Sequence, residues 1–334
     1  YNYQWYGDKQ TLIEAYDMMK GYVMYLKNKA TDNIVSHGLG DWFDIGPDRP
    51  GVSQLTKMGV TGTATYYYDL TIMTQVAKLL HKNSDEKVFK QLTADVKKSF
   101  NRHFFDKQKL QYDSASQTAN AMALYMDLVE APYKKAVLDA LIKDIRSRNN
   151  ALTAGDVGYR YVLRALEDAG RSDVIYEMNN RDDVPGYGFQ LKHGATALTE
   201  SWQAYPSVSN NHFMLGHLME WFYAGLAGIK QSKGSVAYKE IEIRPGPVGD
   251  IAAAKASYHS PYGMIISDWK KKDGFFELSV EIPANTFATI YLPADKYAVV
   301  KEKDKKWNDL IYKDKKAIIK LGSGAYHFTV QQNN

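Results

Sequence analysis

The spacing of hydrophobic residues changes once along the chain of 334 residues, after Gly228. Before this point apolar residues recur every three or four positions, as over 159–166, which is typical of amphipathic helices. Beyond it they alternate with polar residues, as over 276–282, which is typical of strands with one buried face. The change predicts a mainly α chain with two domains: a helical domain over 1–230 and an antiparallel β-sandwich over 231–334.

The helical part contains several separate amphipathic segments. The first carries an apolar stripe from Leu12 to Leu26, and Gly170 is placed to end the segment over 156–169. The other expected helices are 61–80, 86–103, 115–128, 132–146, 172–179, 196–203 and 211–227. Helical hairpins in such an array suit either a solenoid or a closed α/α toroid. Loops that gather acids and Trp residues favour the toroid, whose chemistry lies at one end.

Charge and composition exclude several classes of function. The 42 basic and 38 acidic residues give a net charge of +4, and the lysines are scattered, so we expect no nucleic-acid partner. The absence of Cys excludes disulfides, thiolate metal sites and thiol nucleophiles. No apolar run approaches the roughly 20 residues that span a bilayer, so we expect no membrane span. The chain begins with aromatic residues and without Met, so we expect a piece of a longer protein.

Two segments near the middle of the chain combine a carboxylate, indoles and imidazoles, which is the chemistry of a sugar-binding cleft. The first, HGATALTESW, runs from His193 through Glu200 to Trp202, and the second, SNNHFMLGHLMEW, covers 209–221 and contains His212. A carboxylate beside a Trp can take a proton from water or a hydroxyl while the indole stacks on a pyranose ring. No metal or phosphate site is as well supported by the sequence.

Three loops between the expected helices are rich in Gly and polar groups. They cover 37–47, 150–156 and 182–188, and the first of them contains Asp41 next to Trp42. Glycine lets the backbone come close to a ligand, and loops often carry binding residues. We therefore expect Asp41 and Trp42 to contact a ligand.

These segments together resemble the bacterial α-L-rhamnosidases of glycoside hydrolase family 78. The resemblance is carried by GLGDWFDIGP (38–47), QLT (54–56), TGTATYYYDL (61–70), QTANAMAL (117–124), HGATALTESW (193–202) and SNNH (209–212). It extends over essentially the whole chain and is most specific at the last two segments. It implies an (α/α)6 toroid followed by a C-terminal β-sandwich, hydrolysis of terminal α-L-rhamnosyl residues with inversion, and no metal or other cofactor in the chemical step.

The same resemblance assigns a catalytic role to one residue of the chain. Glu200 matches the family's general base by its position in its motif. Inverting hydrolysis also needs a general acid, and the two carboxyl groups lie about 6.5–9.5 Å apart. The family's acid belongs to an upstream motif that has no match here, and fewer helices are predicted than a complete (α/α)6 toroid contains. We therefore expect a toroid that is incomplete at its N-terminal side, and an isolated piece with little or no activity.

The remaining candidates for the binding of a rhamnose-containing glycan have simple structural alternatives. His212 could be a core histidine that donates to a backbone carbonyl. His193, Trp202 and Asp156 could belong to a loop or to the wall of the cleft. Asp41 lies on the sugar-binding face according to the resemblance, but it could also cap a turn.

Two other classes of function stay open. The toroid also occurs in other glycosidases and in polysaccharide lyases, and a lyase would need a Tyr or His base and a cation for a uronate. The second class is a non-catalytic carbohydrate-binding or scaffold protein, which the missing acid motif favours. The family's habit of degrading glycans makes the periplasm or secretion the expected location, with the cytoplasm as the alternative.

Overall fold

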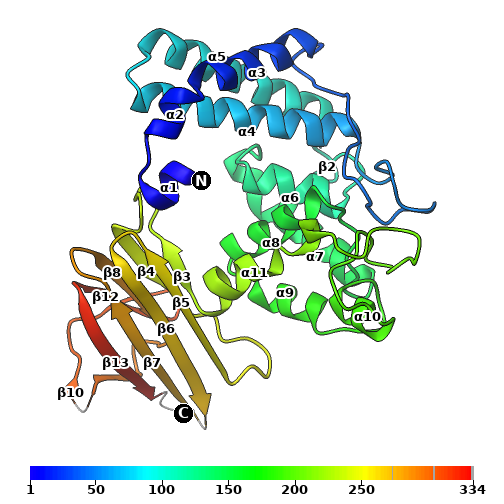
Figure 1. Cartoon of the computed structure of the whole chain (residues 1–334). Coiled ribbons are helices and arrows are strands. Elements are labelled where there is room, and N and C mark those ends of the chain that lie inside the picture. The colour runs from blue at the N-terminus through cyan, green and yellow to red at the C-terminus, as the bar shows by residue number, and fades with distance from the viewer. Residues whose placement is uncertain (273, 304, 332–334) are drawn as a thin grey trace. The chain divides into compact units, whose positions relative to one another are not determined.

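The computed structural model describes residues 1–272, 274–303 and 305–331, which form two compact units. One unit combines Tyr1–Leu12 with Met219–Asn334, and the other comprises Ile13–Leu218; their helices and strands are labelled in Figure 1. The order of a helical part and a β part, which the change of period predicts, is confirmed.

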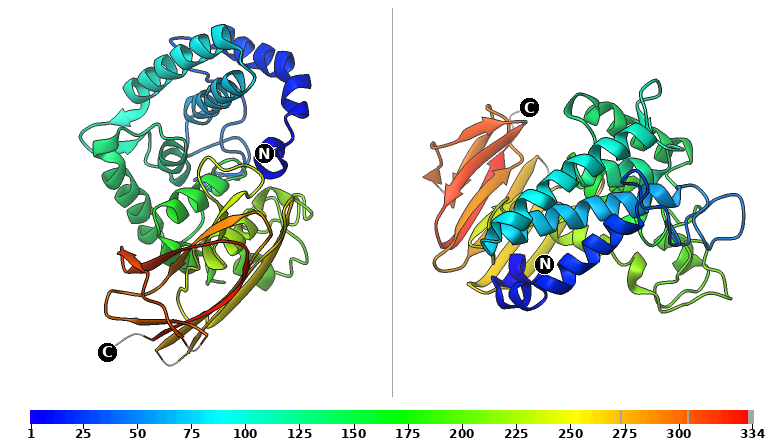
Figure 2. Two further views of the ribbon diagram at one scale, coloured as in Figure 1. Left: turned by 90° about the vertical axis from the view of Figure 1, so that its left-hand side faces the viewer. Right: turned by 90° about the horizontal axis from the view of Figure 1, so that it is seen from above.

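The helical unit consists of helices joined by loops of very different length, one of which covers 30–57. Its elements are α3 (Tyr16–Lys29), α4 (Met58–Leu79), α5 (Asn83–Phe104), β1 (Phe105–Asp106), β2 (Gln111–Tyr112), α6 (Gln117–Tyr125), η1 (Ala131–Tyr133), α7 (Lys134–Ser147), α8 (Gly158–Asp168), α9 (Ser172–Asn179), α10 (Tyr187–Lys192) and η2 (Phe213–Leu215). Figure 2 shows the helices from α3 to α9 following one another around a curve. Two further helices, α2 (Gln10–Glu14) and α11 (Leu218–Trp221), run across the division between the units.

Helix α8 shows how the hydrophobic pattern becomes packing. The predicted stripe of Tyr159, Val162, Leu163 and Leu166 is buried, with each side chain at most 2% exposed, because these positions share one face of the helix. The helix ends where predicted: Gly170 has a φ of 71°, and its amide donates to the carbonyl oxygen of Glu167.

The predicted helix over 196–203 is wrong, because backbone groups in this segment bond to partners outside it. The amide of Glu200 donates to the carbonyl oxygen of Ser209 at 2.9 Å, and the hydroxyl of Thr199 donates to the backbone carbonyl oxygen of Ser201 at 2.6 Å. Such side-chain bonds compete with a helical ladder. The helix expected over 211–227 is not continuous. It divides into η2, α11 and the π-helical η3 (Phe222–Leu226).

The other unit is a sandwich of two sheets. The six-stranded sheet has the order β10-β9-β13-β7-β6-β5, and the five-stranded sheet has the order β11-β12-β8-β4-β3. The strands are β3 (Ile229–Gln231), β4 (Glu240–Ile243), β5 (Ala253–Ser260), β6 (Gly263–Lys272), β7 (Phe275–Ile282), β8 (Phe287–Leu292), β9 (Val299–Glu302), β10 (Lys305–Lys306), β11 (Ile311–Lys313), β12 (Lys316–Leu321) and β13 (Gly324–Gln331). Among the described residues, neighbouring strands are antiparallel except β4 and β8, which are parallel. A parallel pair needs a long connection, and β5, β6 and β7 supply it.

A short N-terminal segment belongs to this unit. Helix α1 (Asn2–Tyr6) lies in it, and the carbonyl oxygen of Gln4 accepts from the amide of Ala237 at 2.8 Å and from Nε2 of Gln231 at 3.1 Å. The unit is therefore built from segments that lie more than 200 residues apart in the sequence.

Alternate residues of the strands fill the space between the sheets. The four apolar residues at 276, 278, 280 and 282 are at most 4% exposed, as the alternating pattern predicts. Trp269 is fully buried, and its indole N–H donates to the carbonyl oxygen of Leu226 at 2.9 Å. Among the helices that the described residues form, none combines the length and the apolar character needed to cross a membrane.

Trp269→Ala should lower the free energy of unfolding by about 3–5 kcal/mol, because it empties the space of a large core side chain. It also removes one of two hydrogen bonds to the carbonyl oxygen of Leu226, which keeps the bond from the amide of Gly246. Ile311→Ala is the matched control, since this side chain of the same unit is 64% exposed and its loss should cost less than about 0.5 kcal/mol. Guanidinium titrations measure both values, and equal losses would contradict the assignment of Trp269 to the core.

Candidate active site

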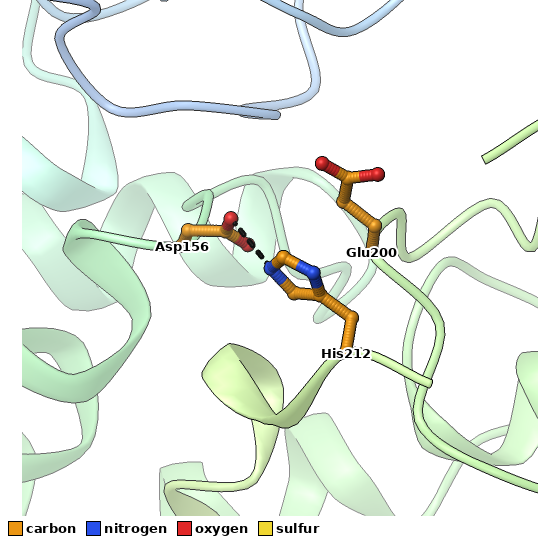
Figure 3. Close-up of side chains that lie close together, drawn as sticks. All are labelled: Asp156, Glu200 and His212. Carbon is orange, nitrogen blue, oxygen red and sulfur yellow. Dashed lines mark hydrogen bonds and ion pairs between the residues drawn. The ribbon is translucent and has the colours of Figure 1, made fainter. Parts of the chain in front are cut away.

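Three side chains of the helical unit converge on one point (Figure 3): Asp156, Glu200 and His212. Each contributes one carboxylate oxygen or ring nitrogen, and these atoms all lie within 4.8 Å of one another. Asp156 comes from the turn before α8, Glu200 from the irregular segment after α10, and His212 from the residue before η2. Asp156 adds a third segment to the two that predicted a cleft, and it lies 44 positions before Glu200 in the sequence.

Glu200 is held by two donors from different segments. Its Oε1 accepts from the indole N–H of Trp42 at 3.1 Å, and its Oε2 accepts from the backbone amide of Ser209 at 3.3 Å. The two bonds come from different segments and fix the direction of the carboxylate. The side chain is partly exposed, so water can reach it. These features are those of a base that removes a proton from water.

Asp156 and His212 form a hydrogen-bonded pair beside Glu200. The distance from His212 Nε2 to Asp156 Oδ2 is 2.9 Å, and Asp156 is 6% exposed. Burial raises the pKa of Asp156, the bond and charge of His212 lower it, and the charge of Glu200 raises it. The other oxygen of Asp156 is buried and has no hydrogen-bond partner among the described residues. Asp156 therefore fixes the ring of His212 by a bond to one of its two nitrogens.

Asp41 lies in the interior rather than on a binding surface. It is 0% exposed, and its carboxylate accepts from the hydroxyl of Thr118 at 2.5 Å and from the amides of Gly155 at 2.9 Å and Gly158 at 2.8 Å. Burial raises the pKa of Asp41 to about 6, because desolvation outweighs these three bonds. The expected sugar contact of Asp41 is replaced by a role in joining two loops.

The joined loops carry the residues that border the site. The carbonyl oxygen of Trp42 accepts from the amide of Asp156 at 2.8 Å, so Asp41 lies at the crossing of the two segments. Gly155 permits this approach, since a Cβ at its position would come 2.1 Å from the carbonyl oxygen of Trp42. Trp42 itself is partly exposed and faces Glu200, which is consistent with its predicted place on the binding face.

Trp202 and His193 do not join the cluster. Trp202 is 0% exposed, donates from its indole to the carbonyl oxygen of Ala154 at 2.8 Å, and packs edge-on against Tyr159 and Tyr187. No face of this indole is free for a sugar, so Trp202 supports the wall of the site. His193 is exposed at the end of α10, where its ring stacks on Phe189 with centroids 3.9 Å apart. The structure thus supports the wall and loop alternatives for these two residues.

Asp156 is the member of the cluster that sequence reasoning ranked too low. It stands in the sequence Gly-Asp-Val-Gly, between two glycines whose amides both bond to Asp41. An acidic residue between glycines, directly before a helix with a buried face, is the signal that could have marked it.

The cluster of Asp156, Glu200 and His212 also contains groups that a divalent cation accepts as ligands. The ring nitrogen of His212 is already bonded to Asp156, and both oxygens of Glu200 accept hydrogen bonds. The bond to Asp156 uses only one ring nitrogen of His212, and the second oxygen of Asp156 has no partner among the described residues. These groups can therefore take part in proton transfer, bind a sugar hydroxyl or hold a cation.

Comparison with known proteins decides the family. Residues 1–226 match the model of the bacterial alpha-L-rhamnosidase 6 hairpin glycosidase domain, and residues 228–306 match the model of the bacterial alpha-L-rhamnosidase C-terminal domain. The chain belongs to the bacterial alpha-L-rhamnosidase family. The match to a six-hairpin domain confirms the toroidal class of the helical part of this rhamnosidase-family chain.

Individual relatives agree with this assignment. The chain is 29% identical to an alpha-L-rhamnosidase of Streptomyces avermitilis over 98% of its own length and 32% of that protein. It is 28% identical to one of Formosa agariphila, over 96% of its own length and 36% of that protein. This rhamnosidase-family chain therefore spans about a third of the length of these curated relatives.

Solved structures show the same similarity. The alpha-L-rhamnosidase of Dictyoglumus thermophilum superimposes with a TM-score of 0.91 at 34% identity, over 98% of this chain and 38% of that one. The Streptomyces avermitilis alpha-L-rhamnosidase complexed with L-rhamnose gives a TM-score of 0.88 at 28% identity, over 98% of this chain and 32% of that one. The rhamnosidase fold thus covers both parts of the chain.

The raised pKa of Asp41 predicts a dependence of stability on pH. Between about pH 4 and 6 the folded protein keeps a proton on Asp41 that the unfolded chain has lost, so this group makes the free energy of unfolding fall as pH rises. Asp41→Asn should remove this fall, which is on the order of 1–3 kcal/mol. Denaturant titrations at several pH values measure it as the difference between wild type and variant.

The control for this experiment is Asp48→Asn, in the same loop but exposed. Its stability should follow the wild type at every pH. If the Asp41→Asn variant also follows the wild type between pH 4 and 6, then Asp41 is not the buried group that the structure shows.

Proposed function

We propose that this chain is part of an α-L-rhamnosidase that hydrolyses terminal α-L-rhamnosyl residues with inversion, and that Glu200 is its general base. The observation that carries the proposal is the position of Glu200, whose partly exposed carboxylate is held by Trp42 and Ser209 next to the pair of His212 and Asp156. The substrate class follows the family, and the sugar is that named for the Streptomyces avermitilis structure, L-rhamnose.

In the proposed reaction, water attacks the anomeric carbon while Glu200 takes one of its protons. The bond from that carbon to the glycosidic oxygen breaks, and a general acid protonates the departing oxygen. Attack from the face opposite to the leaving group inverts the anomeric configuration. The hydrogen bonds from Trp42 and Ser209 hold the carboxylate of the base in position before the reaction begins.

Asp156 does not fit the role of the acid in this reaction. An inverting pair is separated by about 6.5–9.5 Å so that water and sugar can lie between the carboxyl groups. Asp156 and Glu200 approach within 4.8 Å, and Asp156 is already bonded to His212. We therefore assign the acid to the part of the longer relatives that this chain does not match.

His212 is proposed to bind a hydroxyl of the sugar. Its side chain is 23% exposed, while the side chain of its partner Asp156 is 7% exposed and fixes the ring of His212. A hydrogen bond from an oriented imidazole discriminates between sugars that differ in the position of one hydroxyl. The lyase alternative receives no comparable support, because the cluster of Asp156, Glu200 and His212 holds two carboxylates where a uronate substrate would need a cation.

The deciding test is hydrolysis of p-nitrophenyl α-L-rhamnoside by the protein extended upstream to its natural start. Glu200→Gln should lower kcat by about 10²–10⁴, because glutamine cannot accept the proton. Glu177→Gln on α9 is the control and should leave the rate unchanged. NMR of the first product should show the inverted anomer.

Three results would contradict the proposal in different ways. Full activity of the Glu200→Gln variant would exclude Glu200 as the base. A retained anomeric configuration would exclude inversion. An extended protein that does not cleave rhamnosides but cleaves another glycoside would exclude rhamnosides as the substrate. The 334-residue chain alone is expected to show almost no activity.

Trp42→Phe tests the support of the base. It keeps an aromatic ring but removes the N–H that bonds to Glu200, so kcat should fall about tenfold, as expected for one hydrogen bond to a charged group. Trp5→Phe, a partly exposed indole of the other unit, is the control and should leave kcat unchanged. An unchanged kcat in the Trp42→Phe variant would show that the indole N–H does not support the base.

A further inference from the structure

The outer face of the five-stranded sheet carries a group of positive charges that the catalytic proposal does not use. On β8, Ile290 and Leu292 point into the sandwich and are fully buried, so Tyr291 between them points outward. On β12, Lys316 and Ile318 alternate with the buried Ala317 and therefore share this outer face.

Strand pairing brings the charged residues together around Tyr291. Ile318 on β12 lies directly opposite Tyr291, which places Lys316 two residues further along the same face. Arg244 follows the last residue of β4, and the carbon of its guanidinium lies 4.0 Å from the centroid of the Tyr291 ring. Lys313 on β11 pairs with Lys316.

The charges of this group repel one another. Burial, followed by the charges of Arg244 and Lys230, lowers the pKa of Lys316 to about 8, and only Asp314 acts in the opposite direction. Among the described residues, no carboxylate forms an ion pair with Arg244 or Lys316 within 4.0 Å. A bound anion would relieve this repulsion.

We propose that the face formed by Arg244, Tyr291 and Lys316 binds the carboxylates of an acidic glycan that contains uronic acid residues. A guanidinium stacked on an aromatic ring keeps its N–H edge free and binds a carboxylate in a planar, bidentate manner. Lys316 supplies a point charge for a neighbouring oxygen. The choice of a glycan as the carrier of the carboxylate rests on the proposed function.

The experiment measures binding of trigalacturonate to the full chain by isothermal titration calorimetry at pH 7. Wild type should bind it saturably, and Arg244→Gln combined with Lys316→Gln should weaken binding at least about tenfold, because two charged contacts are lost. Lys301→Gln combined with Lys305→Gln is the matched control, since it removes two exposed lysines from the six-stranded sheet. The control should bind like the wild type.

The pH dependence gives a second readout. Binding requires the charged form of Lys316, so affinity should fall as pH rises from 7 to 9. Lys316→Gln should remove this fall, while Arg244→Gln should shift it to higher pH, because the charge of Arg244 contributes to the lowered pKa of Lys316. If the double variant fails to unfold cooperatively, Arg244→Gln alone replaces it, because Arg244 is exposed.

Several outcomes would overturn the proposal. These are the absence of saturable binding, equal binding of the methyl-esterified trisaccharide, equal binding by the double variant, and displacement by inorganic sulfate at equal concentration. The last would mean a site for small anions. Glu200→Gln should leave the binding of trigalacturonate unchanged. A protein that does not cleave rhamnosides can therefore still confirm the carboxylate-binding face, so the catalytic proposal and this one can fail separately.

Discussion

The candidate site depends on one buried carboxylate that does not face it. Asp41 accepts hydrogen bonds from Thr118 on α6 and from two amides on either side of Asp156. The residue after Asp41 is Trp42, which donates to Glu200. One side chain in the interior thus sets the relative position of Glu200, of its donor Trp42 and of Asp156, which orients His212.

This arrangement costs stability and needs glycine. Among the described residues, no basic side chain forms an ion pair with Asp41, and its three hydrogen bonds only partly offset burial, as its raised pKa indicates. A Cβ at Gly158 would come 1.9 Å from the hydroxyl oxygen of Thr118, so the amides can approach the carboxylate only because side chains are absent there. Strain and unusual burial of this kind are tolerated where they position functional groups.

The sequence predicted elements whose pattern is local, and it failed where partners are distant. The stripe on α8 and the alternation on β7 follow from periodicity, which decides which face is buried. Periodicity did not reveal that the backbone of Glu200 would bond to Ser209, which turned an expected helix into irregular chain. It also cannot tell a polar residue that faces a ligand from one that is buried, so it predicted a ligand contact for Asp41 and did not separate the partner of His212, Asp156, from the buried Trp202.

The division of the chain between its two units determines which unit can fold first during synthesis. Tyr1–Leu12 packs with residues from Met219 onward, although the entire helical unit comes between them in the sequence. During translation this segment leaves the ribosome long before the residues that donate hydrogen bonds to it, such as Ala237, whose amide donates to the carbonyl oxygen of Gln4. The helical unit can therefore fold first, and Gln4 obtains its partners Gln231 and Ala237 only after all of that unit has been made.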